Sequence, residues 1–189
     1  MYETLEGKNI ILRKAKIEDT ESMLKHIWSN EEVYKWMLFK PTFTCLDAIE
    51  RCKRSIEFQK DHYAYFVALK TTNEAIGLCA MREIENGIFE ESGIAIGSSF
   101  QGKGYGKEIV SLLLQLAFDK LGAKEFRYSY FDNNIKSKAL ANHFGFSYSL
   151  EVQMIRPWDN SLKTIIITKL SKENYDKLKS TNVLSSSSI

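Results

Sequence analysis

Apolar residues recur along the first half of the chain in patterns that predict alternating helices and strands. Helical spacing together with capping residues predicts three helices, over residues 18–28, 31–38 and 44–59. A Thr44 hydroxyl and an Asp47 carboxylate three residues apart form a capping box that would open the last of them. Aromatic and β-branched runs predict four strands, over residues 8–14, 63–69, 75–85 and 88–97. Asn86-Gly87, between the last two runs, is a strong hairpin signal.

The second half of the chain opens with a helix over residues 107–121. Its apolar side chains cover most of the helical circumference, which is typical of a buried helix. The elements predicted after it are a strand at 125–130, a helix at 135–144, and strands at 146–155 and 163–170. Hairpin-linked strands followed by a mixed order of helices and strands predict one α+β domain.

Composition narrows the class of protein. A chain of 189 residues that is 44% hydrophobic can fill one core, so we expect one domain over residues 1–178 and a flexible Ser-rich tail over 179–189. The formal charge of +2 argues against a nucleic-acid partner, and no apolar run is long enough for a membrane span. Three cysteines without a CxxC pair favour a reducing cytoplasm, and the scattered histidines give no metal motif.

A glycine-rich turn, residues 101–107, lies between a predicted strand and the buried helix. Its three glycines in five residues let the backbone approach a ligand and turn several amides toward one point. The start of the following helix adds a partial positive charge, and Lys103 and Lys107 add full ones. The turn is therefore expected to hold an anion such as a pyrophosphate.

The spacing of the glycines and lysines in this turn distinguishes between the known classes of phosphate-binding loop. A Walker A loop fails because Gly106-Lys107 is followed by Glu108, and the GxGxxG fingerprint fails from either starting glycine. The turn instead matches [Gln/Arg]-x-x-Gly-x-[Gly/Ala] and resembles the coenzyme A pyrophosphate loop of the GNAT superfamily of N-acetyltransferases. Taken alone, the residues also fit a plain strand-to-helix turn whose lysines face solvent.

Further motifs extend the resemblance over residues 8–170. Asn134-Ile135-Lys136-Ser137, followed by His143-Phe144-Gly145-Phe146, resembles the later Asn-x-x-[Ser/Ala]…Gly-Phe block of the family. Residues 33–37 and 170–175 are loosely similar to the ends of the ribosomal-protein branch, whose members acetylate an N-terminal Ala or Ser.

The resemblance implies a mostly antiparallel, twisted central sheet, flanked by helices and splayed by a bulge between its fourth and fifth strands. It also implies acetyl-CoA as co-substrate, with the backbone of Ile94, Ala95 and Ile96 facing the pantetheine and acetyl group. The pyrophosphate contacts implied are Gln101, Gly102, Lys103, Gly104, Tyr105, Gly106 and Lys107, and the contacts nearer the sulfur are Asn134 and Ser137.

The resemblance also suggests which groups move protons. Transfer needs a neutral amine, and Glu91 is the candidate base, with Glu90 as the alternative if the bulge shifts the register. Many members place a tyrosine acid seven residues after the Asn, but this chain has Ala141 there. Ser137 matches the serine found near the thiol sulfur in the ribosomal-protein branch, where it acts as an acid or only positions the sulfur.

The acceptor is the least defined part of the prediction. Four aromatic residues are candidates for walls of an amine pocket: Trp28, Tyr34, Trp36 and Trp158. A protein N-terminus and a small-molecule amine (an antibiotic, a polyamine or an amino acid) both stay open. So do a non-catalytic acyl-CoA sensor and the choice between a monomer and a homodimer.

Overall fold

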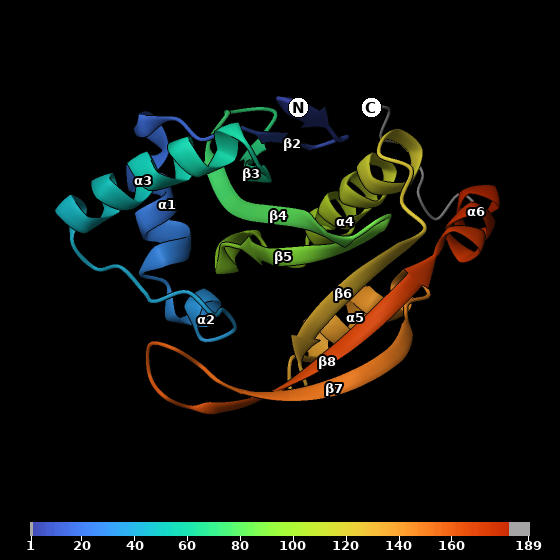
Figure 1. Cartoon of the computed structure of the whole chain (residues 1–189). Coiled ribbons are helices and arrows are strands. Elements are labelled where there is room, and N and C mark those ends of the chain that lie inside the picture. The colour runs from blue at the N-terminus through green and yellow to red at the C-terminus, as the bar shows by residue number, and fades with distance from the viewer. Residues whose placement is uncertain (1, 182–189) are drawn as a thin grey trace.

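The computed structural model describes residues 2–181, and this part of the chain is built around one eight-stranded sheet (Figure 1). The strand order is β1-β2-β3-β4-β5-β6-β8-β7, and every neighbouring pair is antiparallel except β5 and β6. The strands are β1 Thr4–Glu6, β2 Ile10–Arg13, β3 Tyr63–Leu69, β4 Ala75–Glu85, β5 Ile88–Ile96, β6 Glu125–Phe131, β7 Ser147–Ile155 and β8 Leu162–Ser171. The predicted α+β class is confirmed.

Helices cover both faces of the sheet (Figure 1). The helical segments are η1 Ile17–Asp19, α1 Thr20–Met23, η2 Leu24–Trp28, α2 Glu31–Tyr34, α3 Cys45–Lys60, η3 Ser98–Phe100, α4 Tyr105–Gln115, η4 Leu116–Lys120, α5 Ile135–His143 and α6 Lys172–Ser180. Val67 packs with α4, whereas its neighbour Phe66 packs with α1, η2 and α3. Because consecutive strand residues point to opposite faces, α4 and the group α1–α3 lie on opposite sides of the sheet.

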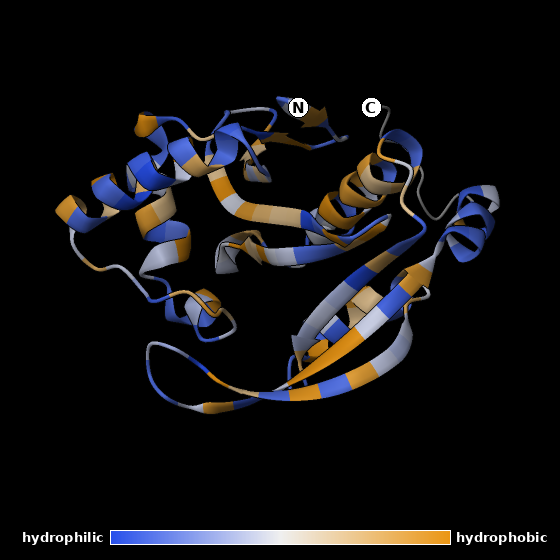
Figure 2. Ribbon diagram, in the orientation of Figure 1, coloured by the Kyte–Doolittle hydropathy of each residue, from blue (hydrophilic) through white to orange (hydrophobic). Residues whose placement is uncertain are grey.

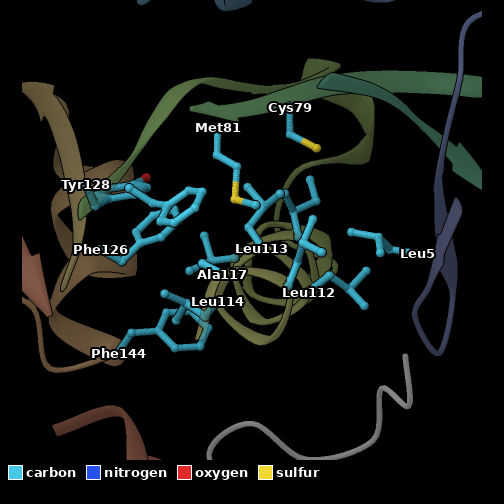
Figure 3. Close-up of a cluster of buried hydrophobic side chains, with 14 of the residues drawn as sticks. Leu5, Cys79, Met81, Leu112, Leu113, Leu114, Ala117, Phe126, Tyr128 and Phe144 are labelled. Atoms are coloured by element: carbon cyan, nitrogen blue, oxygen red, sulfur yellow. The ribbon is translucent and has the colours of Figure 1, made fainter. Parts of the chain in front are cut away.

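The larger core forms around α4, as its all-round apolar sequence predicts. Figure 2 shows α4 as mostly apolar, whereas α6 is mostly hydrophilic. Leu112, Leu113 and Leu114 are at most 1% exposed. In Figure 3 Leu113 and Leu114 lie between Met81 of β4 and Phe144 at the end of α5, and Leu112 lies toward Leu5 of β1. This packing fixes the start of α4, and with it the glycine turn, against the middle of the sheet.

A bulge and a splay interrupt the sheet at β5. Cys79 pairs with Ile94, and Met81 pairs with Glu91. An advance of two residues along β4 therefore corresponds to three residues along β5, which is a β-bulge in β5. The parallel pairing of β5 with β6 ends at Glu90 and Arg127, and beyond that point the two strands separate. The expected splay between the fourth and fifth predicted strands is confirmed, since β5 and β6 are those strands.

The sequence analysis missed three short elements, of which the three-residue turn η3 is one. Strand β1 has three residues, too few for a periodic signal, and it depends on pairing with β2. Helix α6 has nine residues and is fixed by Tyr175, which is fully buried, stacks on Phe118 and donates a 2.7 Å hydrogen bond to Asp119. Helix α6 includes residues 179 and 180, which were expected to belong to the flexible tail. Residues 182–189 of that expected tail lie outside the described part of the chain. No helix within residues 2–181 is long and apolar enough to cross a membrane.

Candidate active site

The glycine turn presents open backbone at the start of α4. Gly102 and Gly104 have φ of +78° and +87°, a region that L side chains rarely adopt, and a Cβ at either position would meet no atom within 4 Å. Within residues 2–181 the N–H groups of Gly102, Lys103 and Gly104 donate no hydrogen bond. The first turn of α4 adds further amides without intrahelical partners. The turn has the geometry of an anion cradle.

A cleft of about 610 Å³ runs from this turn along the splayed edge of β5. Eleven of the residues expected to contact acetyl-CoA line it: Ile94, Ala95, Ile96, Gln101, Gly102, Gly104, Tyr105, Gly106, Lys107, Asn134 and Ser137. Lys103 does not line it, and its ammonium lies over the Phe100 ring, 5.4 Å from the centroid. The fold therefore brings three separate sequence motifs to one cavity.

The Gln101 side chain braces the turn. Its amide nitrogen donates to the Ile96 carbonyl at 2.9 Å, and its amide oxygen accepts from Lys136 at 2.7 Å. The turn is thus joined to the end of β5 and to α5. Lys136 has no distinctive sequence signal, and only the fold reveals its contact.

The separation of β5 from β6 leaves one edge of β5 open inside the cleft. Ile94, Ala95 and Ile96 pair with β4 on one side, but β6 has already diverged on the other. Gly77 of β4 permits close packing there, since a Cβ at that position would lie 2.4 Å from the Ala95 carbonyl oxygen. An extended ligand with amide groups, such as a pantetheine arm, could pair with the open edge.

Glu91 bridges the two strands just beyond their last paired residues. One carboxylate oxygen accepts from the Ser129 hydroxyl at 2.7 Å and from its N–H at 3.3 Å, and the other accepts from the Gly93 N–H at 2.7 Å. Burial raises the pKa of Glu91 above its ordinary value because the charged form loses solvation. Its neighbour Glu90 is paired with Arg82 on the sheet surface, at 2.8 Å from the guanidinium Nε.

Ser137 lies at the first turn of α5, where Asn134 caps the helix by accepting the Ser137 N–H at 3.1 Å. The Ser137 hydroxyl is 2.6 Å from the phenol oxygen of Tyr128, and both residues line the cleft. Ala141, at the position where many GNAT members carry a tyrosine, is 1% exposed. The sequence analysis passed over Tyr128, since one tyrosine in an aromatic strand gives no signal of a site.

The four aromatic residues proposed for the acceptor side take different places. Trp36 lines the cleft. Trp28 does not, because it is 1% exposed and packs in the core against Phe66. Tyr34 and Trp158 do not line the cleft either, but they meet edge to face with ring centroids 6.0 Å apart.

Arg156 fastens the β7–β8 loop to the end of α2. Its guanidinium donates to the Lys35 carbonyl at 2.8 Å, pairs with Asp159 and lies over the Trp158 ring. Hydrogen bonds from Arg156 and Ser161 hold the Asp159 pKa well below its usual range. This contact keeps α2 and the last hairpin together across the splayed region of the sheet.

Nine further residues line the cleft and were not predicted as site residues, although Val33, Met37, Lys136 and His143 lie within segments that carry the family resemblance: Glu32, Val33, Met37, Phe100, Tyr128, Lys136, Ala139, Leu140 and His143. Most come from α2 and α5, whose cleft-facing sides depend on how these helices pack on the sheet. Within residues 2–181 no group of His, Cys, Asp and Glu side chains is arranged to hold a metal ion.

Comparison with known proteins identifies the family. Residues 9–147 match the family model described as an acetyltransferase (GNAT) domain. The chain is 31% identical over 150 residues to the uncharacterized N-acetyltransferase p20 of Bacillus licheniformis, an alignment that covers 76% of this chain and 82% of p20.

Solved structures share the fold. A GCN5-related N-acetyltransferase from Brucella melitensis superposes with a TM-score of 0.80 at 19% identity, covering 94% of this chain and 82% of that one. A ribosomal-protein-S5-alanine acetyltransferase from Vibrio fischeri superposes with a TM-score of 0.72 at 18% identity, covering 91% and 98%. The family-model match over residues 9–147 and the similarity to p20 show that this chain belongs to the GNAT acetyltransferase family and is an acyltransferase.

Proposed function

We propose that the chain is an acetyl-CoA-dependent N-acetyltransferase that transfers the acetyl group to a primary amine by direct attack on the thioester. One observation carries the proposal. The unpaired amides of the glycine turn open into a cleft that follows the free edge of β5 from Ile96 to Ile94 and reaches Ser137. Glu91 does not line this cleft and lies three residues before Ile94 on the same strand. The family generally uses acetyl-CoA, and its members act on amines.

The residues present fit acetyl-CoA. The free amides at the glycine turn, together with Lys107, would hold the pyrophosphate, and the open edge of β5 would pair with the pantetheine. An amide of Ala95 or Ile96 would stabilise negative charge as it develops on the thioester oxygen. Bound acetyl-CoA supplies an activated acyl group, so the protein has to position it and to move protons.

Glu91 and Ser137 lie on opposite faces of the sheet at the splay, and we assign the base to Glu91 and the contact with sulfur to Ser137. Tyr128 and Ser129 are consecutive in β6, so their side chains point to opposite faces of the sheet. Ser137 contacts Tyr128, and Glu91 contacts Ser129. Glu91 would take the proton from the attacking amine, and its raised pKa makes it a stronger base than an exposed glutamate.

The acceptor amine is proposed as a protein N-terminus, with a small-molecule amine as the second candidate. The first rests on the structural likeness to the ribosomal-protein-S5-alanine acetyltransferase and on the loose sequence match to that branch. The second rests on Trp36 and Glu32, an aromatic and an acidic side chain that line the cleft and could contact a small cationic amine.

Thiol release from acetyl-CoA across a panel of amines tests the proposal. The panel holds peptides beginning with Ala or Ser, polyamines, aminoglycosides and free amino acids. Release that depends on an amine supports the enzyme, and the best amine identifies the acceptor class. Tight binding of acetyl-CoA without release for any amine would favour an acyl-CoA sensor and contradict catalysis.

A further inference from the structure

The hydroxyls of Tyr128 and Ser137 form an isolated pair beside the cleft, which we call the hydroxyl pair. Their oxygens are 2.6 Å apart, one from β6 and the other from the first turn of α5. Within residues 2–181 neither oxygen has a second hydrogen-bond partner, and both residues line the cleft. Tyr128 is only 3% exposed, so its phenol is fixed in this position.

A count of hydrogens shows what the hydroxyl pair can offer a ligand. Two hydroxyl groups carry two hydrogens, and one of these lies between the two oxygens. The other has no acceptor within residues 2–181 and is left for the cleft. A phenol is a stronger acid than an aliphatic alcohol, so the favoured arrangement has Tyr128 donating to Ser137. The remaining hydrogen then belongs to Ser137, the residue that lies next to the helix cap formed by Asn134.

Burial reinforces this arrangement. It raises the pKa of Tyr128 well above that of a free tyrosine, because a phenolate would lose its solvation, and nearby Glu91 adds to the effect. Tyr128 therefore keeps its proton throughout the pH range in which an amine can act as nucleophile. A neutral, fixed phenol is suited to orienting a neighbouring hydroxyl, not to giving up its own proton.

We propose that Tyr128 is a positioning residue that turns the Ser137 hydroxyl toward the sulfur of acetyl-CoA, so that Ser137 donates a hydrogen bond to the leaving thiolate. The inference rests on the proposed function. In this step the bond between the acetyl carbon and sulfur breaks, and its electron pair goes to sulfur. Ser137 stabilises that charge, and the thiolate takes its proton from solvent on release. The hydroxyl pair thus stabilises the leaving thiolate in a chain that has Ala141 at the position where many family members carry a tyrosine acid.

Variants of the hydroxyl pair separate this role from a purely structural one. Tyr128→Phe keeps the ring and removes only the donor, and Ser137→Ala removes the hydroxyl that would contact sulfur. Tyr130→Phe is the matched control, since Tyr130 lies two residues along the same strand and does not line the cleft. Calorimetry first measures CoA binding to each protein. The ultraviolet absorbance of the thiolate then gives the pKa of the bound CoA thiol.

The wild type is expected to lower the pKa of the bound thiol relative to free CoA. Tyr128→Phe and Ser137→Ala should each raise it by about one pKa unit, the size of one hydrogen bond to a charged group. Tyr130→Phe should leave it at the wild-type value. The same two variants should lower kcat for acetyl transfer by about tenfold, and the double variant should lose no more than Ser137→Ala alone, because Tyr128 acts through Ser137.

Two results would overturn the inference while leaving the proposed function intact. One is CoA binding with the same thiol pKa in all four proteins. The other is a double variant whose loss equals the product of the two single losses, since independent effects would mean that Tyr128 does not act through Ser137. Absence of CoA binding by the wild type would instead overturn the proposed function, and this inference with it.

Discussion

Replacing Glu91 with Gln removes the proposed base, while the side chain keeps nearly the same size and shape. The Gln oxygen can still accept both hydrogen bonds from Ser129, but its NH₂ group then faces the Gly93 N–H. One hydrogen bond to a charged acceptor is lost. The expected fall in the free energy of unfolding is about 1–2 kcal/mol, since the cost of burying a charge disappears as well. In a chain of this size Tm should fall by about 2–8 °C.

The effect of Glu91→Gln on turnover should be much larger than its effect on stability. General base catalysis contributes about 10²–10⁴-fold, so kcat should fall at least about 100-fold while the affinity for acetyl-CoA stays unchanged. In the wild type the rate should fall as the pH drops through the raised pKa of Glu91, because only the carboxylate accepts a proton. The pH–rate profile of Glu91→Gln should lack this fall in rate at acidic pH.

The raised pKa also fixes the sign of the pH dependence of stability. A carboxyl group whose pKa is higher in the folded state stabilises the fold fully below the unfolded pKa. That contribution is lost as the pH rises through the folded pKa. The stability advantage of the wild type over Glu91→Gln should therefore be largest at low pH and narrow toward neutral pH, as measured by urea denaturation over a pH series.

Glu90→Gln is the matched control for Glu91→Gln. It breaks an ion pair with Arg82, whose side chain is 68% exposed, and such surface pairs contribute about 0.2–1 kcal/mol. Its kcat should stay within about twofold of the wild type. Equal turnover of Glu91→Gln and the wild type at every pH, or an equal loss in Glu90→Gln, would refute the assignment of the base.

Four other variants probe separate parts of the structure. Lys107→Met should weaken acetyl-CoA binding by about tenfold and flatten its salt dependence, whereas Lys103→Met should have a smaller effect, as calorimetry would show. Arg156→Met frees the β7–β8 loop from α2 and should raise KM for the amine several-fold without changing KM for acetyl-CoA in steady-state kinetics. Arg13→Met leaves the buried Asp19 carboxylate without its partner and should lower the free energy of unfolding by about 3–5 kcal/mol in urea denaturation.

Local signals in the sequence were enough for most of the sheet and for the conformation of the glycine turn. The Thr44 hydroxyl accepts the Asp47 N–H as predicted, although in the described part of the chain the Asp47 carboxylate accepts from that hydroxyl and not from the Thr44 N–H, so only half of the capping box forms. Asn134 caps α5 as expected. Gly102 and Gly104 take the positive φ values that their spacing in the turn suggests. Each of these features depends on neighbours within a few residues, which is why a sequence can predict it.

The features that escaped prediction depend on contacts between distant segments. Trp28 was a candidate for a pocket wall, yet packing against β3 and α3 places it in the core. Helix α6 is too polar to predict by periodicity and depends on the burial of Tyr175. The contact of Tyr128 with Ser137 requires α5 to lie on β6, a packing choice that neither segment encodes alone.

Calorimetric titration with acetyl-CoA of the wild type and of Gly104→Val tests the central claim, that the glycine turn holds the donor. A β-branched residue at φ +87° strains the turn and moves its amides, so affinity should fall at least about tenfold. Gly122→Val is the matched control, since Gly122 has φ +70° and equally open surroundings but lies at the far end of the same helical segment. Wild-type binding that is lost in Gly104→Val and kept in Gly122→Val is the predicted result. Equal affinity in all three proteins, or no binding by the wild type, would contradict the account.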